Sequence, residues 1–276
     1  MLTLFNLLYD VIIYLYALSL LFYFSDCIRR NPRAKRIGTG FLIMVSAIQA
    51  ISITIRTIDE RTLPLFSTYD FFFFLTFILI LISFFIEKVL KTEYAVLLLN
   101  VIGFCAMVQN RLHSPGEGAL PSGWDTVHGL LILHVVLANL SFAFYTVSAV
   151  FAAMYLFLHR KLKRKKWDNT VRRLPSLESM EKYTYTSMLI GTPLLIVSLI
   201  VALMSIFSEG RYILLLDLKV VFTLLALCVY IAYFATRRLR SYSPVIMARW
   251  AIAGYIVFIL NFVANSWSAF HQWVGS

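Results

Sequence analysis

The sequence predicts an all-α protein: a polytopic membrane helix bundle of about eight transmembrane helices, with both termini outside. Three observations lead to this class. Hydrophobic residues make up 60% of the 276 residues and charged residues only 14%, whereas soluble domains are about 45–50% apolar. The apolar residues lie in blocks of about 20, the length that crosses a hydrocarbon core about 30 Å thick. Short basic segments separate these blocks.

Each apolar block is expected to cross the membrane as a helix. The blocks cover residues 5–25, 37–55, 69–87, 93–109, 127–158, 185–207, 213–236 and 247–270. The first block is not expected to be a removable signal peptide, because it lacks a basic leading segment and contains Asp10. The longest connection, of about 25 residues, is too short for a packed soluble core. Residues 1–276 are therefore expected to form a single integral-membrane domain.

The basic residues predict the orientation. Of the 25 Lys and Arg residues, 20 lie in alternate connections, and basic connections face the cytoplasm. Residues 159–182 form the most basic one and are expected to be a cytoplasmic loop. This loop is either solvated, or lies along the anionic inner leaflet, or contacts a partner. The net charge of +11 thus reflects membrane topology and does not indicate a nucleic-acid partner.

Few residues offer covalent or catalytic chemistry. The three cysteines, Cys27, Cys105 and Cys228, are scattered and predict neither a disulfide framework nor a dithiol redox site. No Ser-His-Asp constellation, Gly-rich phosphate loop or paired carboxylate is present. We therefore expect no catalytic residues and no enzymatic activity.

The third block opens with LPLFSTYDFFFF. Pro64 ends any earlier helix, and Ser67 or Thr68 can cap the new one. Asp70 falls in the first turn, where a carboxylate complements the helix dipole. That complementarity is enough to account for Asp70, and a functional role is the alternative.

The fifth block contains His134, and a histidine inside an apolar run is costly unless the protein uses it. Counting about 20 residues outward from His159 and Arg160 puts the outer hydrocarbon edge near Ala138. His134 then lies about one turn outside that edge. Small and hydroxyl residues share its face, which favours helix contact and predicts that His134 points into the bundle. That face consists of Ala138, Ser141, Tyr145, Ser148, Ala152 and Tyr155.

The eighth block carries a second polar stripe, with His271 at its outer end. The stripe is Gly254, Phe258, Asn261, Asn265, Ser268 and Gln272. His134 and His271 are thus expected on one side of the membrane at similar depth. Two neutral imidazoles can hold a haem iron from both faces, and nearby aromatic residues could wall the haem: Phe142, Trp267, Phe270 and Trp273. Alternatively, both histidines only hydrogen-bond to water or headgroups. A metal site without porphyrin is disfavoured, because no further ligands follow at regular spacing.

Five segments, in order over about 200 residues, resemble the cytochrome c assembly family of the CcsA, ResC and CcmC types. The L-x-x-H-V segment with a later aromatic matches Leu131, His134, Val135 and Tyr145. The P-x-x-x-x-Y-E segment matches Pro64, Tyr69 and Asp70. The other three segments begin at LPSLESMEKY, ILLLDLKVVF and ANSWSAFHQW, and the last places His271 at the family's histidine position.

The resemblance implies that His134 and His271 are external haem ligands flanking a Trp-rich haem-presenting loop. In this chain that loop reads MSIFSEGRYILLLDLK, which has no tryptophan and keeps only Asp217 and Lys219 of the motif. Ala235 stands at the position of the family's intramembrane histidine. These departures make the chain most similar to the HemX-type branch of the family. That branch implies a non-enzymatic role in haem (porphyrin) biosynthesis, adjusting the level of early tetrapyrrole-pathway enzymes, glutamyl-tRNA reductase in particular.

Three functions follow as hypotheses. The first is a multi-pass plasma-membrane regulator of haem biosynthesis that binds haem through His134 and His271 and contacts a soluble tetrapyrrole-pathway enzyme at its cytoplasmic loops. The second is a haem-handling component of cytochrome c assembly, acting in haem attachment or export. The third is a small-molecule transporter, which a broken helix with midplane charges would favour. Asp217 and Lys219 are charged but are expected near the outer edge.

Overall fold

The computed structural model describes residues 2–60, 63–65, 67–90, 92–111, 126–165, 169–209, 218–240 and 243–265. Over these ranges the protein is entirely helical, which confirms the predicted all-α class. Eight of the helices are long and apolar enough to cross a membrane, as the sequence predicted. The helices are α1 (Leu2–Ile28), α2 (Pro32–Glu60), α3 (Thr68–Val89), α4 (Glu93–Asn110), α5 (Thr126–Lys163), α6 (Asn169–Arg173), α7 (Leu177–Glu209), α8 (Leu218–Arg240) and α9 (Pro244–Asn265).

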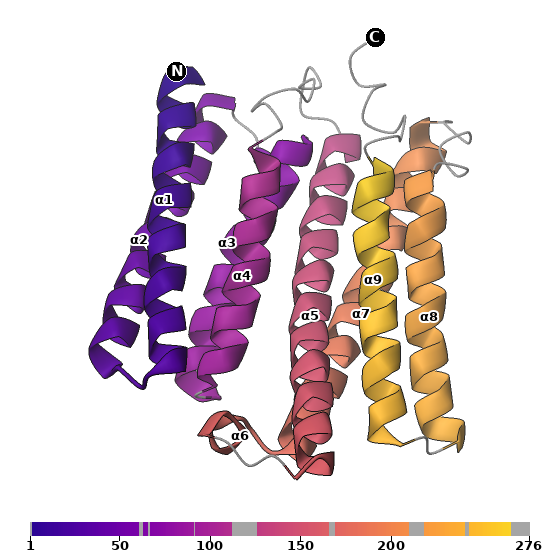
Figure 1. Cartoon of the computed structure of the whole chain (residues 1–276). Coiled ribbons are helices and arrows are strands. Elements are labelled where there is room, and N and C mark those ends of the chain that lie inside the picture. The colour runs from indigo at the N-terminus through magenta and orange to yellow at the C-terminus, as the bar shows by residue number, and fades with distance from the viewer. Residues whose placement is uncertain are drawn as a thin grey trace. The chain divides into compact units, whose positions relative to one another are not determined.

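Contacts between the helices divide the chain into two compact units, residues 1–119 and residues 120–276. In unit 1, α1 packs against α2 and α4, and α3 packs against α4. In unit 2, α5 packs along α7, while α9 packs against both α8 and α5 (Figure 1). The expectation of one domain over 1–276 stays a prediction, and so does the cytoplasmic side assigned from the charges.

The start of α3 is set by a capping box. The backbone N–H of Asp70 donates to the Ser67 side chain at 3.0 Å, and the backbone N–H of Ser67 donates to the Asp70 carboxylate at 3.3 Å. This confirms that a cap follows Pro64 and selects Ser67. Asp70 is buried and also forms an ion pair with Arg56 of α2. The helix dipole is therefore only one of the interactions that stabilise the Asp70 carboxylate.

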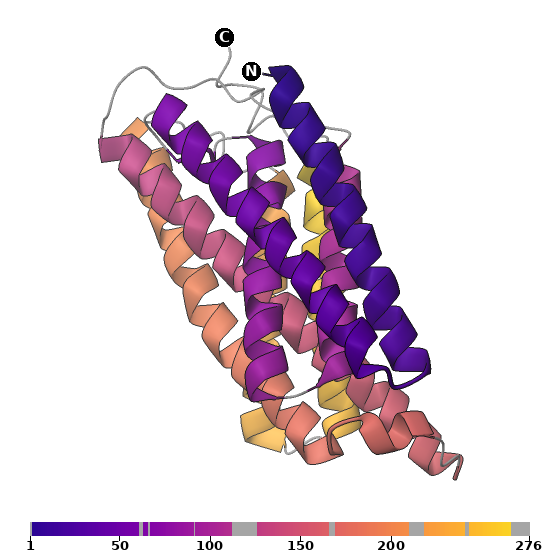
Figure 2. The same cartoon turned by 90° about the vertical axis from the view of Figure 1, so that its left-hand side faces the viewer.

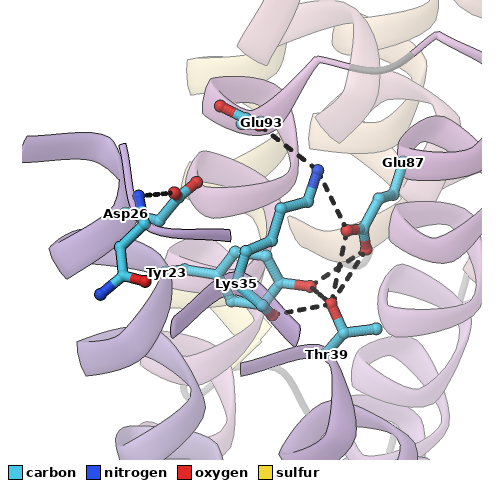
Figure 3. A network of polar contacts seen from close by, with 7 residues as sticks. Tyr23, Asp26, Lys35, Thr39, Glu87 and Glu93 are labelled. Atoms are coloured by element: carbon cyan, nitrogen blue, oxygen red, sulfur yellow. Dashed lines mark hydrogen bonds and ion pairs between the residues drawn. The ribbon is translucent and has the colours of Figure 1, made fainter. Parts of the chain in front are cut away.

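A polar network joins all four helices of unit 1 at one end (Figure 3). The Lys35 ammonium lies 3.4 Å from the carboxylates of both Glu87 and Glu93, which belong to α3 and α4. The Tyr23 hydroxyl of α1 donates to Glu87 at 3.1 Å and contacts the Thr39 hydroxyl at 2.8 Å. These groups lie beside the connections that the charge pattern assigns to the cytoplasm.

The expected basic loop at 159–182 is shorter than the sequence suggested. Residues 159–163 extend α5, and residues 177–182 begin α7. The short α6 lies between them, where the chain turns from α5 into α7 (Figures 1 and 2). Lys and Arg are good helix formers, and cations in a last turn complement the helix dipole. The basic residues at the end of α5 therefore continue the helix.

Glycines allow tyrosines to cross between helices in both units. A Cβ atom at Gly103 of α4 would lie 2.5 Å from the Tyr16 hydroxyl of α1. A Cβ atom at Gly254 of α9 would lie 2.7 Å from the Tyr230 ring of α8. Tyr230 in turn stacks on Tyr145 of α5, with ring centroids 3.9 Å apart. Small residues permit such close approach of membrane helices, so Gly254 sets the spacing of α8 and α9.

We expect Gly254→Ala to destabilise the protein by about 1–3 kcal/mol, because the methyl group overpacks the ring of Tyr230, which the stack on Tyr145 holds in place. The measurement is the thermal unfolding midpoint of the full chain purified in detergent. Gly129→Ala is the matched control in unit 2, because a Cβ atom there would meet no other group within 4 Å. Equal midpoints for the two variants would contradict the role given to Gly254.

Candidate functional site

The polar face of α5 lies against α7, as its helical spacing predicted. Hydroxyl groups on this face donate hydrogen bonds to groups of α7 at three successive levels. The pairs are Ser141 with the Gly191 carbonyl at 2.9 Å, Tyr145 with the Thr192 hydroxyl at 3.1 Å, and Ser148 with the Thr184 carbonyl at 3.1 Å. Acceptors inside the bundle thus satisfy hydroxyl groups that lipid could not.

His134 continues this face by one further level and contacts Ser198 of α7 twice. Its Nδ1 atom lies 2.8 Å from the Ser198 carbonyl oxygen and 2.9 Å from the Ser198 hydroxyl oxygen. The Ser198 hydroxyl donates to the backbone carbonyl of His134 at 3.0 Å. Ser198 is fully buried and His134 is half-buried. The two residues therefore clamp each other across the contact between α5 and α7.

This geometry assigns the tautomer of His134. A carbonyl oxygen can only accept, so Nδ1 carries the proton that it donates to Ser198. In the neutral ring the lone pair then lies on Nε2. Histidines that bind a metal usually donate their other N–H to a backbone carbonyl or carboxylate in this way. The bond between His134 and Ser198 resembles that arrangement.

The contact with Ser198 also places His134 along the bundle. Ser198 lies 11 residues before Glu209, the last residue of α7, a distance of roughly 16 Å along the axis. The intervening segment 199–207 reads LIVALMSIF. His134 is therefore level with an apolar part of α7, and its expected place at the outer interface stays a prediction. A long helix can tilt or extend past the bilayer, so its length does not determine depth.

Most other residues expected at the site lie outside the residues that the structure describes. These are His271, Trp267, Phe270, Trp273 and Asp217, together with the side chain of Lys219. The structure therefore describes one of the two expected haem ligands. Among the described residues, no three His, Cys, Asp or Glu side chains gather as a metal site.

Two described aromatic residues of α5 that the sequence associated with the haem site, Phe142 and Tyr145, belong to the core of unit 2. Phe142, expected as a wall for haem, packs on Tyr255 and Phe258 of α9, with ring centroids 5.7 Å and 5.1 Å away. Tyr145, the aromatic residue of the L-x-x-H-V segment, is buried between α7, α8 and α9 through Thr192, Tyr230 and Phe258. In this segment His134 contacts Ser198 of α7, and Tyr145 packs the helices together.

Two buried asparagines lie one level inward of His134 and were not expected there as a pair. The contacts of Thr146 with Tyr255 and of Phe142 with Phe258 set α5 and α9 in register. Asn139 lies three residues before Phe142 on α5, and Asn261 lies three residues after Phe258 on α9. Both amide oxygens are buried and have no hydrogen-bond partner within the described ranges. No pattern in the sequence could single out Ser198 or this pair, because each depends on register between helices.

Comparison with known proteins gives matches over both units. The family model described as Cytochrome C assembly protein matches residues 5–271. Protein HemX of Brevibacillus brevis is 30% identical over 269 residues, which cover 96% of this chain and 97% of the relative. Protein HemX of Bacillus subtilis (strain 168) is 30% identical over 262 residues, which cover 94% of each. With eight apolar helices and a match along nearly its whole length, the chain belongs to the cytochrome c assembly protein family, a haem-related family of membrane proteins.

Proposed function

We propose that the chain is a non-enzymatic plasma-membrane protein of haem biosynthesis that binds haem through His134. In this role it adjusts the cellular level of an early tetrapyrrole-pathway enzyme, glutamyl-tRNA reductase. The observation that carries the haem-binding part is the hydrogen bond from Nδ1 of His134 to the Ser198 carbonyl. The regulatory part rests on the similarity to the HemX relatives and on the basic end of unit 2.

The residues at His134 fit a haem ligand. Such a ligand is a neutral imidazole with a lone pair on one nitrogen and a held proton on the other. Ser198 holds the proton of His134 from a fully buried position. We assign the second ligand position to His271, which the sequence predicts on the same side of the membrane and at a similar depth. Haem bound by these residues would supply a redox-active iron, while His134 and Ser198 would bind and orient it.

The end of unit 2 at which α5 meets α7 is suited to an acidic partner. Several basic side chains there are exposed: Arg160, Lys163, Arg164, Lys165 and Arg172. Arg237 at the same end interacts within unit 2: its guanidinium donates to Glu181 at 3.0 Å and lies over the Tyr185 ring. The exposed cations are the contact surface that we propose for the soluble enzyme, in addition to the lipid bilayer.

A second candidate function is haem handling in cytochrome c assembly, as a lyase or export component. The family match over residues 5–271 favours it. The stretch MSIFSEGRYILLLDLK speaks against it, because a haem-presenting loop of that family is rich in tryptophan and this stretch has none. A transporter is favoured less, because each span is a continuous helix where the structure describes it, including α7 with Pro193 inside.

We expect the purified chain to take up added haem and to show a Soret absorption band, and His134→Ala to abolish or strongly weaken that band. His271→Ala should weaken it, because one of the two proposed ligands is lost. His159→Ala is the control, since His159 stacks on Tyr155 at the opposite end of α5. A wild-type chain that takes up no haem would contradict the proposal of haem binding.

Ser198→Ala should lower haem affinity about 10-fold, at the low end of the effect of removing a group that orients a metal ligand. The carbonyl of residue 198 still accepts from Nδ1, so binding is weakened and not lost. Ser198→Thr keeps the hydroxyl and should restore affinity in a haem titration. Ser141→Ala removes a comparable hydroxyl from the same helix contact. If it lowers affinity as much as Ser198→Ala, the hydroxyl acts only through packing.

Deletion of the gene should raise the level of glutamyl-tRNA reductase, because a sensor that limits haem synthesis lowers the first enzymes of the pathway when haem is sufficient. The measurement is an immunoblot of the reductase in the deletion strain. Complementation with the wild-type chain should reverse the effect, and His134→Ala should not. Unchanged reductase would refute the regulatory role, whereas full complementation by His134→Ala would separate regulation from haem binding.

A further inference from the structure

Unit 1 contains a small cavity that the proposed function does not use. It lies between α1, α2 and the start of α3, and its volume of about 20 Å³ is room for one water molecule. Pro64, Tyr69 and Asp70 line it, and these are the three positions that resemble the P-x-x-x-x-Y-E segment. The remaining walls are largely apolar, from Leu8, Ile12, Ile53, Phe73 and Phe74.

Ser52 of α2 brings a buried hydroxyl to this cavity. Its residue is 4% exposed, and its oxygen has no hydrogen-bond partner in the described part of the chain. Other hydroxyls of α2 return to a carbonyl of their own helix: Ser46 to Ile43, Thr54 to Ala50 and Thr57 to Ile53. Ser52 makes no such bond. Burying an unpaired hydroxyl costs free energy, so a partner is expected on the cavity side.

The charges around the cavity decide what kind of partner fits. Arg56 lies one helical turn after Ser52 on the same face of α2 and is paired with Asp70 of α3. The two side chains are only 12% and 5% exposed, respectively. Because their charges cancel, an added ion would be uncompensated in a poorly solvated site. The occupant is therefore neutral, and it must accept from a guanidinium or hydroxyl and donate to a carboxylate.

We propose that this cavity holds one ordered water molecule, bonded to the Ser52 hydroxyl and to the Arg56–Asp70 pair. Water has the size that the cavity admits and the mixed donor and acceptor capacity that its walls require. It joins α2 to the capped start of α3. Pro64, Tyr69 and Asp70 therefore line a hydrated site that does not depend on haem.

Thermal unfolding of the full chain in detergent tests the proposal, because the direction in which Ser52→Ala shifts the unfolding midpoint depends on whether water is bound. If water is bound, Ser52→Ala removes its partner and lowers the midpoint, on the order of 2–4 °C. If the cavity is dry, the same change removes an unpaired hydroxyl and raises the midpoint. Ser83→Ala is the control, because Ser83 is equally buried in unit 1 but bonds to the Ile80 carbonyl; it should shift the midpoint less. An unchanged or raised midpoint for Ser52→Ala overturns the proposal.

Hydroxyl-radical footprinting with synchrotron X-rays provides a direct readout, since a bound water is radiolysed in place and oxidises its neighbours. We expect oxidation of Tyr69 in the wild-type chain and its loss in Ser52→Val, which fills the space with methyl groups. Tyr16 is the buried reference, because its hydroxyl is bonded to Asn100 away from the cavity. Tyr69 oxidation at the level of Tyr16, or oxidation that persists in Ser52→Val, overturns the proposal even if Ser52→Ala lowers the midpoint.

Discussion

The structure depends on one constraint: a polar group buried among membrane helices must find its partner inside the protein, because lipid offers none. Ser141 and Ser148 of α5 meet this constraint through carbonyls of α7. At the end of unit 1, the partly exposed Lys35 ammonium likewise lies between two carboxylates of other helices. Each of these bonds joins one helix to another, so the satisfaction of polar groups also determines which helices pack together.

The same constraint prepares His134 for chemistry. A histidine between α5 and α7 needs a hydrogen-bond acceptor for its N–H, and the Ser198 carbonyl is that acceptor. When the ring is neutral, its lone pair therefore lies on Nε2. A bond that stabilises the contact of α5 with α7 thus also orients the ring of His134. Tyr145 belongs to the same sequence segment, but its stack on Tyr230 serves the packing of unit 2.

Positions where the constraint is not met within the described residues are informative for the same reason. Ser52 in unit 1 and the pair Asn139 and Asn261 in unit 2 have buried oxygens without a protein partner. Native proteins seldom leave such atoms unpaired. The Ser52 hydroxyl faces a cavity large enough for water. The two amide oxygens lie one level inward of His134, so the candidate site continues into a polar layer of the core.

Hydrophobic blocks, capping residues and helical periodicity are local patterns, so the amino-acid sequence was sufficient to predict the class, the number of spans, a cap at Ser67 or Thr68 and the polar face of α5. It also singled out His134. Only the packed helices show that Ser198 holds His134 and that Arg56 neutralises Asp70. These facts depend on the register of one helix against another. Register is set by the packing of residues that are distant in sequence, such as Gly254 against Tyr230, and no local pattern encodes it.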